Sequence, residues 1–147
     1  MAKTSSHFAG NYAESRQKFL DTASVAGLKV QSHANPQRGP DGEALFTDVV
    51  LAGDAAAPNL FVATSATHGV EGFCGSGAMV GLLREGLTKE RPKDTVVLLV
   101  HALNPHGFAH LRRVNEDNVD LNRNFVDHAA HPANADYAEI HPLLVPT

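Results

Sequence analysis

The feature that most constrains the fold is the stretch Thr95–His101, the most apolar short run of the chain. Its aliphatic and β-branched residues, Thr-Val-Val-Leu-Leu-Val-His, predict a strand. Further strands are expected over residues 28–32, 45–51 and 59–63, the last of them buried, and a helix over residues 75–85. The order strand, strand, helix, strand after residue 44 favours an α/β fold. We therefore expect a mixed sheet flanked by helices, with its later part parallel.

A helix is predicted over residues 11–26, where apolar side chains recur at helical spacing. Asn11 can cap its first turn, Glu14 stands three residues later as in a capping box, and Gly27 suits its end. Residues 35–42 are rich in glycine, proline, asparagine and aspartate, which predicts a turn. These local signals place an amphipathic helix before the first strand and a turn after it.

The composition is that of one globular domain over residues 1–147. Hydrophobic residues make up 43% of the chain and charged residues 19%, which is not the profile of a disordered protein. The net charge of −4 favours neither nucleic acid nor anionic membranes as partners. The N-terminus lacks the apolar stretch of a secretory signal, no run is long enough to span a membrane, and one cysteine, Cys74, cannot form an intrachain disulfide. We therefore expect a cytoplasmic protein.

A first group of polar residues, His68-Gly-Val-Glu71, follows the strand expected over residues 59–63. A histidine nitrogen and a carboxylate oxygen are both good zinc ligands, and at positions i and i+3 of a helical turn they can face one point. Open α/β sheets usually bind ligands beyond the carboxyl ends of their strands. The spacing alone is a weak signal, because a helix start with exposed polar residues explains it as well.

A second group follows the strand at Thr95–His101 and would open at the same sheet edge. It consists of Asn104-Pro-His-Gly-Phe108, the pair Arg112-Arg113, and Asp120-Leu-Asn-Arg-Asn-Phe125. The arginine fork suits carboxylates, and an arginine near a metal can stabilise an oxyanion. The alternative is a solvated polar loop with ordinary surface ion pairs.

In combination, the two groups resemble the M14 family of zinc carboxypeptidases, including its aspartoacylase and succinylglutamate desuccinylase branch. The resemblance is closer to a bacterial family of M14-like proteins, DUF2817. It rests on residues 65–77, 101–108 and 112–125, and it covers nearly the whole chain. It implies a zinc-carboxypeptidase-like fold, of which residues 1–147 would be the N-terminal half in one incomplete domain.

The resemblance also implies a metal site. His68 and Glu71 would bind Zn²⁺ directly, and Asp120 would accept a hydrogen bond from the ring N–H of His68 and fix its tautomer. Zinc would polarise a carbonyl and lower the pKa of a bound water toward ~7. The family's third ligand, a later histidine, and its general base, a later glutamate, have no counterpart that a motif identifies here. Three histidines are candidates by position alone: His128, His131 and His141.

The same resemblance implies a substrate site. Asn122 and Arg123 would hold the free carboxylate of the substrate, and Arg113 would act in catalysis by polarising the scissile carbonyl, with Arg112 as the alternative for that role. The expected activity is zinc-dependent hydrolysis of an amide bond next to a free carboxylate, in a peptide or an N-acyl amino acid, impaired in this chain. The alternatives are a fragment or a carboxylate- or metal-binding module without hydrolase activity, and an incomplete chain whose remainder completes the site.

The partners expected from the sequence are therefore a small molecule or peptide with a free carboxylate, with no nucleic acid and no membrane. A second copy of the chain is a further expected partner. Because this segment would supply only about half of the family's sheet, the sheet edge would be long and apolar. Such an edge favours self-association.

Overall fold

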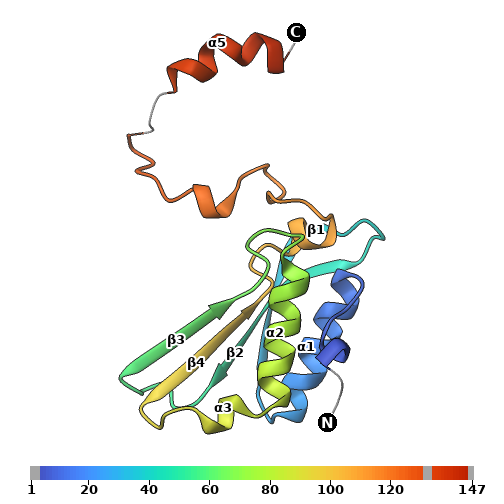
Figure 1. Cartoon of the computed structure of the whole chain (residues 1–147), viewed down its shortest axis with the longest axis vertical. Coiled ribbons are helices and arrows are strands. Elements are labelled where there is room, and N and C mark those ends of the chain that lie inside the picture. The colour runs from blue at the N-terminus through green and yellow to red at the C-terminus, as the bar shows by residue number, and fades with distance from the viewer. Residues whose placement is uncertain (1–3, 131–133, 146–147) are drawn as a thin grey trace.

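The structure, a computed structural model, describes residues 4–130 and 134–145 (Figure 1). One mixed sheet is formed by four strands: β1 (Val30–Arg38), β2 (Ala44–Ala52), β3 (Asn59–Thr64) and β4 (Thr95–His101). Their order across the sheet is β1-β2-β4-β3. β2 runs antiparallel to both its neighbours, whereas β3 and β4 are parallel. The predicted mixed α/β sheet flanked by helices is confirmed.

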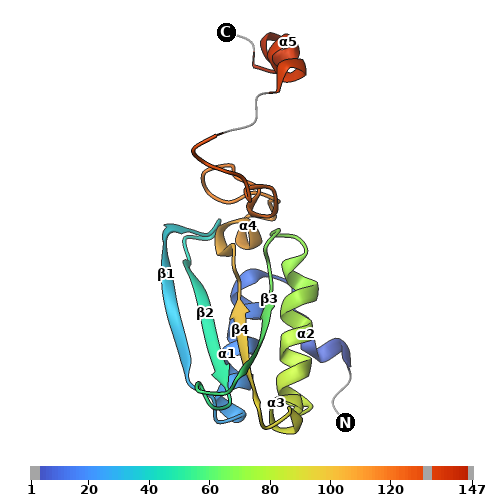
Figure 2. The same ribbon diagram turned by 90° about the vertical axis from the view of Figure 1, so that its left-hand side faces the viewer.

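The helices of the described residues are η1 (Thr4–His7), α1 (Tyr12–Val25), α2 (Gly72–Arg84), α3 (Leu87–Glu90), α4 (Pro105–Ala109), η2 (Leu121–Arg123) and α5 (Ala135–Leu144). α1 and α2 lie side by side on one face of the sheet (Figures 1 and 2). α5 lies apart from the sheet, and none of its residues is buried. None of these helices is long and apolar enough to cross a bilayer.

The core lies between the sheet and the helices α1 and α2. Val50 of β2 and Leu99 of β4 are fully buried, and so are Phe19 of α1 and Val80 of α2. Burying side chains of this size stabilises the fold by about 1.5–3 kcal/mol each. His101 ends β4 on the same face and stacks on Phe19, with ring centroids 4.7 Å apart. This packing fixes the carboxyl end of β4, from which the site loops leave.

The predicted first helix is confirmed, together with the residues that cap it. The side chain of Asn11 accepts a hydrogen bond from the Glu14 N–H at 2.8 Å. The Glu14 carboxylate in turn accepts from the N–H of Gly10, one residue before the position of a standard capping box. Gly27 follows the helix with φ +73°, a conformation that glycine adopts without steric cost.

The prediction that β3 is buried is wrong. Its side chains are exposed at every position except Ala63, which is half-buried. β3 is an edge strand that pairs only with β4 among the described residues, so its apolar composition reports strand propensity and not burial.

Two boundaries also differ from the prediction. β1 continues to Arg38 through residues expected to form a turn; the register breaks between Ala34 and Arg38, and Pro36 lies in this break, as proline does on edge strands. α2 begins at Gly72, earlier than expected. Gly72 and Gly75 lie in its first turn, where they allow the helix to pack closely against Ser65 and Ala66. A Cβ at Gly75 would lie 2.8 Å from the Cβ of Ser65.

Candidate metal centre

The candidate centre lies at the carboxyl ends of the parallel strands β3 and β4, which end on the same side of the sheet. The chain segments that leave the two strands stay paired: the N–H of Leu103 donates to the carbonyl of Ser65, and the N–H of Asn104 to that of Ala66, both at 2.9 Å. This pairing brings the loop that carries His68 against the turn that starts α4.

Two glycines let these loops touch. The N–H of Gly69 donates to the carbonyl of Arg112 at 3.0 Å. A Cβ at Gly69 would overlap the carbonyl of Gly107, and a Cβ at Gly107 would crowd the side-chain amide of Asn104. The close approach therefore requires glycine on both sides, and it places His68 beside the chain that follows α4. The sequence did not predict that these two glycines allow the loops to pack, although Gly69 directly follows His68 and Gly107 directly follows His106.

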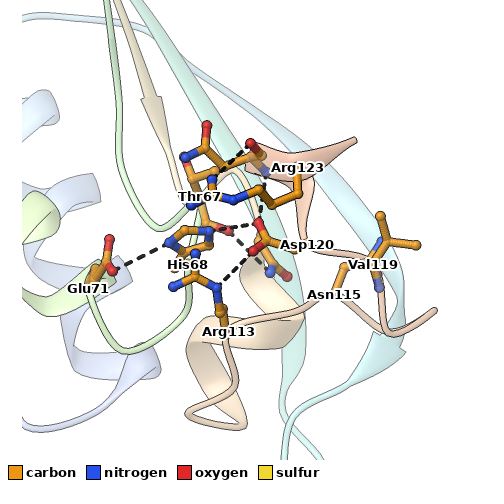
Figure 3. Close-up of polar contacts among 10 residues, drawn as sticks. Thr67, His68, Glu71, Arg113, Asn115, Val119, Asp120 and Arg123 are labelled. Atoms are coloured by element: carbon orange, nitrogen blue, oxygen red, sulfur yellow. Dashed lines mark hydrogen bonds and ion pairs between the residues drawn. The ribbon is translucent and has the colours of Figure 1, made fainter. Parts of the chain in front are cut away.

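His68 is 7% exposed and contacts one carboxylate with each ring nitrogen (Figure 3). Its Nε2 lies 2.8 Å from Oδ1 of Asp120, and its Nδ1 lies 3.4 Å from Oε1 of Glu71. Because an ionised carboxylate only accepts hydrogen bonds, the short contact assigns the proton of the neutral ring to Nε2. The lone pair of Nδ1 then points toward Glu71, at a distance too long for a good hydrogen bond.

Asp120 is held by three donors. Besides His68, the Nε of Arg113 donates to Oδ2 at 2.8 Å, and the backbone N–H of Asn122 donates to Oδ1 at 3.0 Å. The hydrogen bond from His68 first, and then those from Arg113 and Asn122, lower the pKa of Asp120 to about 2 against the opposing effect of desolvation. Asp120 is therefore ionised at neutral pH, as the tautomer assignment requires.

The structure separates the two neighbouring arginines. Arg113 reaches the Asp120 carboxylate, and about half of its side chain remains exposed. The guanidinium of Arg112 donates to the side chain of Asn118 at 3.0 Å, while its backbone carbonyl binds Gly69. Arg113 therefore lies at the candidate centre, whereas Arg112 contributes its backbone.

The residues expected to bind a carboxylate, Asn122 and Arg123, lie in η2 directly after Asp120. Both are exposed, and Nη1 of Arg123 donates to the carbonyl of Asn122 at 3.1 Å. Their guanidinium and amide groups are thus open to solvent beside the candidate centre.

A cavity of about 300 Å³ lies next to this segment. It is lined by residues of β1, β2 and the loops that follow β4, among them His33, Thr47, Glu116 and Leu121. Glu116 accepts a hydrogen bond from the side chain of Asn35 at 2.9 Å, which ties the loop to the end of β1. Sequence reasoning missed this cavity because it assigned residues 35–42 to a turn.

The residues present fit part of a metal site. His68 Nδ1 and the exposed Glu71 carboxylate face one another, and in the neutral ring the Nε2–H donated to Asp120 leaves Nδ1 unprotonated, as a metal ligand must be. Within residues 4–130 and 134–145, no group of three or more His, Cys, Asp or Glu side chains could hold a metal. Neither His128 nor His141 therefore completes a three-ligand group there, and His131 lies outside the described residues.

The chain resembles several solved structures. A candidate metallopeptidase from Shewanella denitrificans OS217 is 23% identical, with a TM-score of 0.57 over 90% of this chain and 47% of its own. A second, from Shewanella amazonensis SB2B, is 21% identical, with a TM-score of 0.49 over 90% of this chain and 50% of its own. An aspartoacylase family protein from Mesorhizobium loti MAFF303099 is 25% identical, with a TM-score of 0.43 over 81% of this chain and 37% of its own.

The chain thus spans about half the length of the two Shewanella proteins. A search of curated proteins found no match. The model of a family described as a protein of unknown function, DUF2817, matches residues 8–147. The chain therefore belongs to the DUF2817 family and has a fold that is shared with a candidate metallopeptidase.

Proposed function

We propose that this chain carries part of the active site of a zinc-dependent hydrolase that cleaves an amide bond next to a free carboxylate. The observation that carries the proposal is the arrangement around His68, whose Nε2 is held by Asp120 while Nδ1 faces Glu71. A histidine oriented by a carboxylate through its second nitrogen is the usual form of a protein metal ligand. The fold shared with a candidate metallopeptidase supports the same reading.

In this proposal, His68 and Glu71 hold the metal, and Asp120 keeps the His68 ring in the binding tautomer. When bound, zinc supplies a polarised substrate carbonyl and a water whose pKa is lowered toward ~7. The low pKa of Asp120 keeps its carboxylate ionised over the pH range in which a neutral histidine can bind metal.

The substrate class follows from the cationic side chains beside the metal residues. Arg113 stands next to Asp120, and Arg123 and Asn122 lie exposed one helical turn further on. A guanidinium binds a carboxylate through two parallel hydrogen bonds, so Arg123 suits the free carboxylate of a peptide or an N-acyl amino acid. Arg113 is assigned to the scissile carbonyl in preference to Arg112, because the Arg113 guanidinium lies at the candidate centre, bonded to Asp120, whereas that of Arg112 is bound to Asn118.

A second candidate function is a carboxylate- or metal-binding module without hydrolase activity. It is favoured by the lack of a three-donor group among the described residues. Two protein ligands hold zinc more weakly than three, and a hydrolase without a positioned base loses about 10²–10⁴-fold in rate. On either function, we expect weak zinc binding and little peptidase activity from residues 1–147 alone.

The test of the proposed function is the zinc content of the purified chain, by elemental analysis after dialysis against a low zinc concentration. His68→Ala should lose the bound zinc. The matched control is His141→Ala, in α5, where the histidine contacts Tyr137 instead of the candidate centre. Equal zinc in the unmodified chain and in His68→Ala would overturn the metal assignment, and chelator-sensitive turnover by the unmodified chain would exclude the module without activity.

A further inference from the structure

The cavity of about 300 Å³ that adjoins the candidate centre takes no part in the proposed metal site. It lies between β1, β2 and the segment that follows β4. One of its lining residues, Leu121, begins η2, the short helix that ends at the exposed Arg123. Another, Asn104, brings its side-chain amide to 3.5 Å from the carbonyl of Thr67, the residue before His68 (Figure 3). The cavity therefore adjoins the site residues through both of these segments.

The walls of this cavity are held in place by hydrogen bonds. Three asparagines line it, and the side-chain oxygen of each accepts a bond from a backbone N–H two to four residues later. These bonds join Asn35 to Gln37, Asn104 to Gly107 and Asn115 to Val119, each at 2.8 Å. Side chains that are already fixed lose little freedom when a ligand binds. The cavity is therefore preformed.

The charge in the cavity comes from Glu116. It is the one carboxylate among the described residues that line the cavity, and no lysine or arginine lies among them. Its Oε1 accepts a hydrogen bond from the amide of Asn35 at 2.9 Å. The second carboxylate oxygen has no hydrogen-bond partner within residues 4–130 and 134–145. A half-buried carboxylate with an unused oxygen favours a cation that can donate a hydrogen bond to it.

The rest of the lining includes apolar side chains, namely Leu103, Pro105 and Leu121. A lysine or arginine side chain has an aliphatic stem that packs on apolar surface and a charged end that needs a polar partner. An acidic side chain would instead meet Glu116 with like charge, which is unfavourable. The lining therefore matches a basic group on an aliphatic stem.

We propose that this cavity binds a cationic group of the substrate, an ammonium or guanidinium on an aliphatic stem. The inference rests on the proposed function for the substrate itself, which becomes a peptide or N-acyl amino acid with a basic side chain on the residue that carries the free carboxylate. Arg123 then receives the carboxylate and Glu116 the cation, and Leu121, between them in the sequence, lines the cavity.

The first experiment tests the cavity without metal or substrate. The metal-free chain is titrated with n-butylammonium chloride and, separately, with n-butanol, while the backbone amide resonances of Asn35, Thr47 and Glu116 are followed by NMR. The ammonium should bind about 5–10-fold more tightly than the alcohol, as expected for a partly buried ion pair. Glu116→Gln should abolish this difference, although its amide oxygen can still accept from Asn35. Asp117→Asn, which removes an exposed charge at the next position, should retain it.

The second experiment tests the substrate class with the zinc-loaded chain. Calorimetric titration should show that Nα-acetyl-L-lysine binds about 5–10-fold more tightly than Nα-acetyl-L-norleucine, which lacks only the ammonium group. Glu116→Gln should remove this preference and leave binding of the norleucine compound unchanged.

The outcomes separate the cavity from the proposed function. Equal binding of n-butylammonium and n-butanol, or a preference that survives in Glu116→Gln, would overturn the cation site. Binding of n-butylammonium together with equal binding of the two acetylated amino acids would overturn its role in substrate recognition. If n-butylammonium binds through Glu116 but neither acetylated amino acid binds, the cation site is supported and the proposed function is overturned.

Discussion

His68 Nε2 lies 2.8 Å from Oδ1 of Asp120, although the two residues are 52 positions apart in the sequence. The contact joins the loop after β3 to the segment after α4, and it determines which nitrogen of His68 is free to bind a metal. Glu71 faces that free nitrogen. The chemistry proposed for this chain therefore depends on a tertiary contact, and the predictions below test its parts.

Replacing Asp120 by asparagine should weaken zinc binding by about 10–100-fold, the usual effect of removing a carboxylate that orients a metal-binding histidine. An amide at this position can donate as well as accept, so the His68 tautomer is no longer fixed. The measurement is competition for zinc with a chromogenic chelator. Asp117→Asn, an exposed carboxylate in the same loop, is the control and should bind zinc like the unmodified chain. If the two variants bind zinc equally, Asp120 does not orient His68.

Gly69→Ala should destabilise the chain by about 1–3 kcal/mol, as overpacking of a closely packed site does. The added methyl group would overlap the carbonyl of Gly107 and force the two site loops apart. Urea unfolding at equilibrium measures the change in the free energy of unfolding, and zinc binding should fall in the same variant. Gly10→Ala is the control, since a Cβ there meets only an ordinary contact with Glu14 at 3.7 Å. A Gly69→Ala protein as stable as this control would contradict the close approach.

The stability of the chain should depend on the protonation of His101. Burial lowers the pKa of this histidine from 6.5 to about 4, opposed by the nearby Asp48 carboxylate. Between these two pH values the unfolded chain binds more protons than the folded one, so the free energy of unfolding is highest above pH 6.5 and falls as the pH decreases toward 4. The loss amounts to roughly 3 kcal/mol.

Urea unfolding at several pH values, with chelator present to remove metal effects, measures this dependence. His101→Gln removes the titrating group and retains an amide that can bond to Ser76, the partner of His101 at 2.9 Å. It should therefore flatten the decrease between pH 6.5 and 4. His33→Gln, an exposed position on β1, should leave the slope unchanged. A slope that survives in His101→Gln would assign the pH dependence to other groups.

Arg113→Ala should weaken binding of an N-acetyl amino acid to the zinc-loaded chain by about 10–100-fold, because a hydrogen bond to a charged group contributes about 1.5–3 kcal/mol and each 1.4 kcal/mol is about a tenfold change. Arg112→Ala should have a smaller effect, since its guanidinium is bound to Asn118 and its carbonyl, which holds Gly69, is unchanged by the substitution. Calorimetric titration of both variants measures the difference. A larger loss in Arg112→Ala would transfer the proposed role to that residue.

Much of the fold could be predicted from local signals. The strand at Thr95–His101 has the predicted bounds, and the helix capped by Asn11 begins and ends within one residue of the prediction. Capping and strand propensity act over a few neighbouring residues, so the sequence alone displays them. The burial of β3 could not be predicted in this way, because burial depends on which elements lie beside a strand.

At the candidate metal centre, too, the local features could be predicted from the sequence, whereas the tertiary contacts could not. The sequence by itself determined that His68 and Glu71 lie three residues apart in the loop that leads from β3 into α2, because such a spacing is a local property. Only the tertiary structure decided that Asp120 binds His68 and that Arg113, instead of Arg112, reaches this carboxylate. Leu111 and Asn118, which flank the two arginines in the sequence, have positive φ of 54° and 61°. Such conformations are stabilised by contacts between distant segments, including the bond from Gly69 to Arg112, which the order of residues alone does not display.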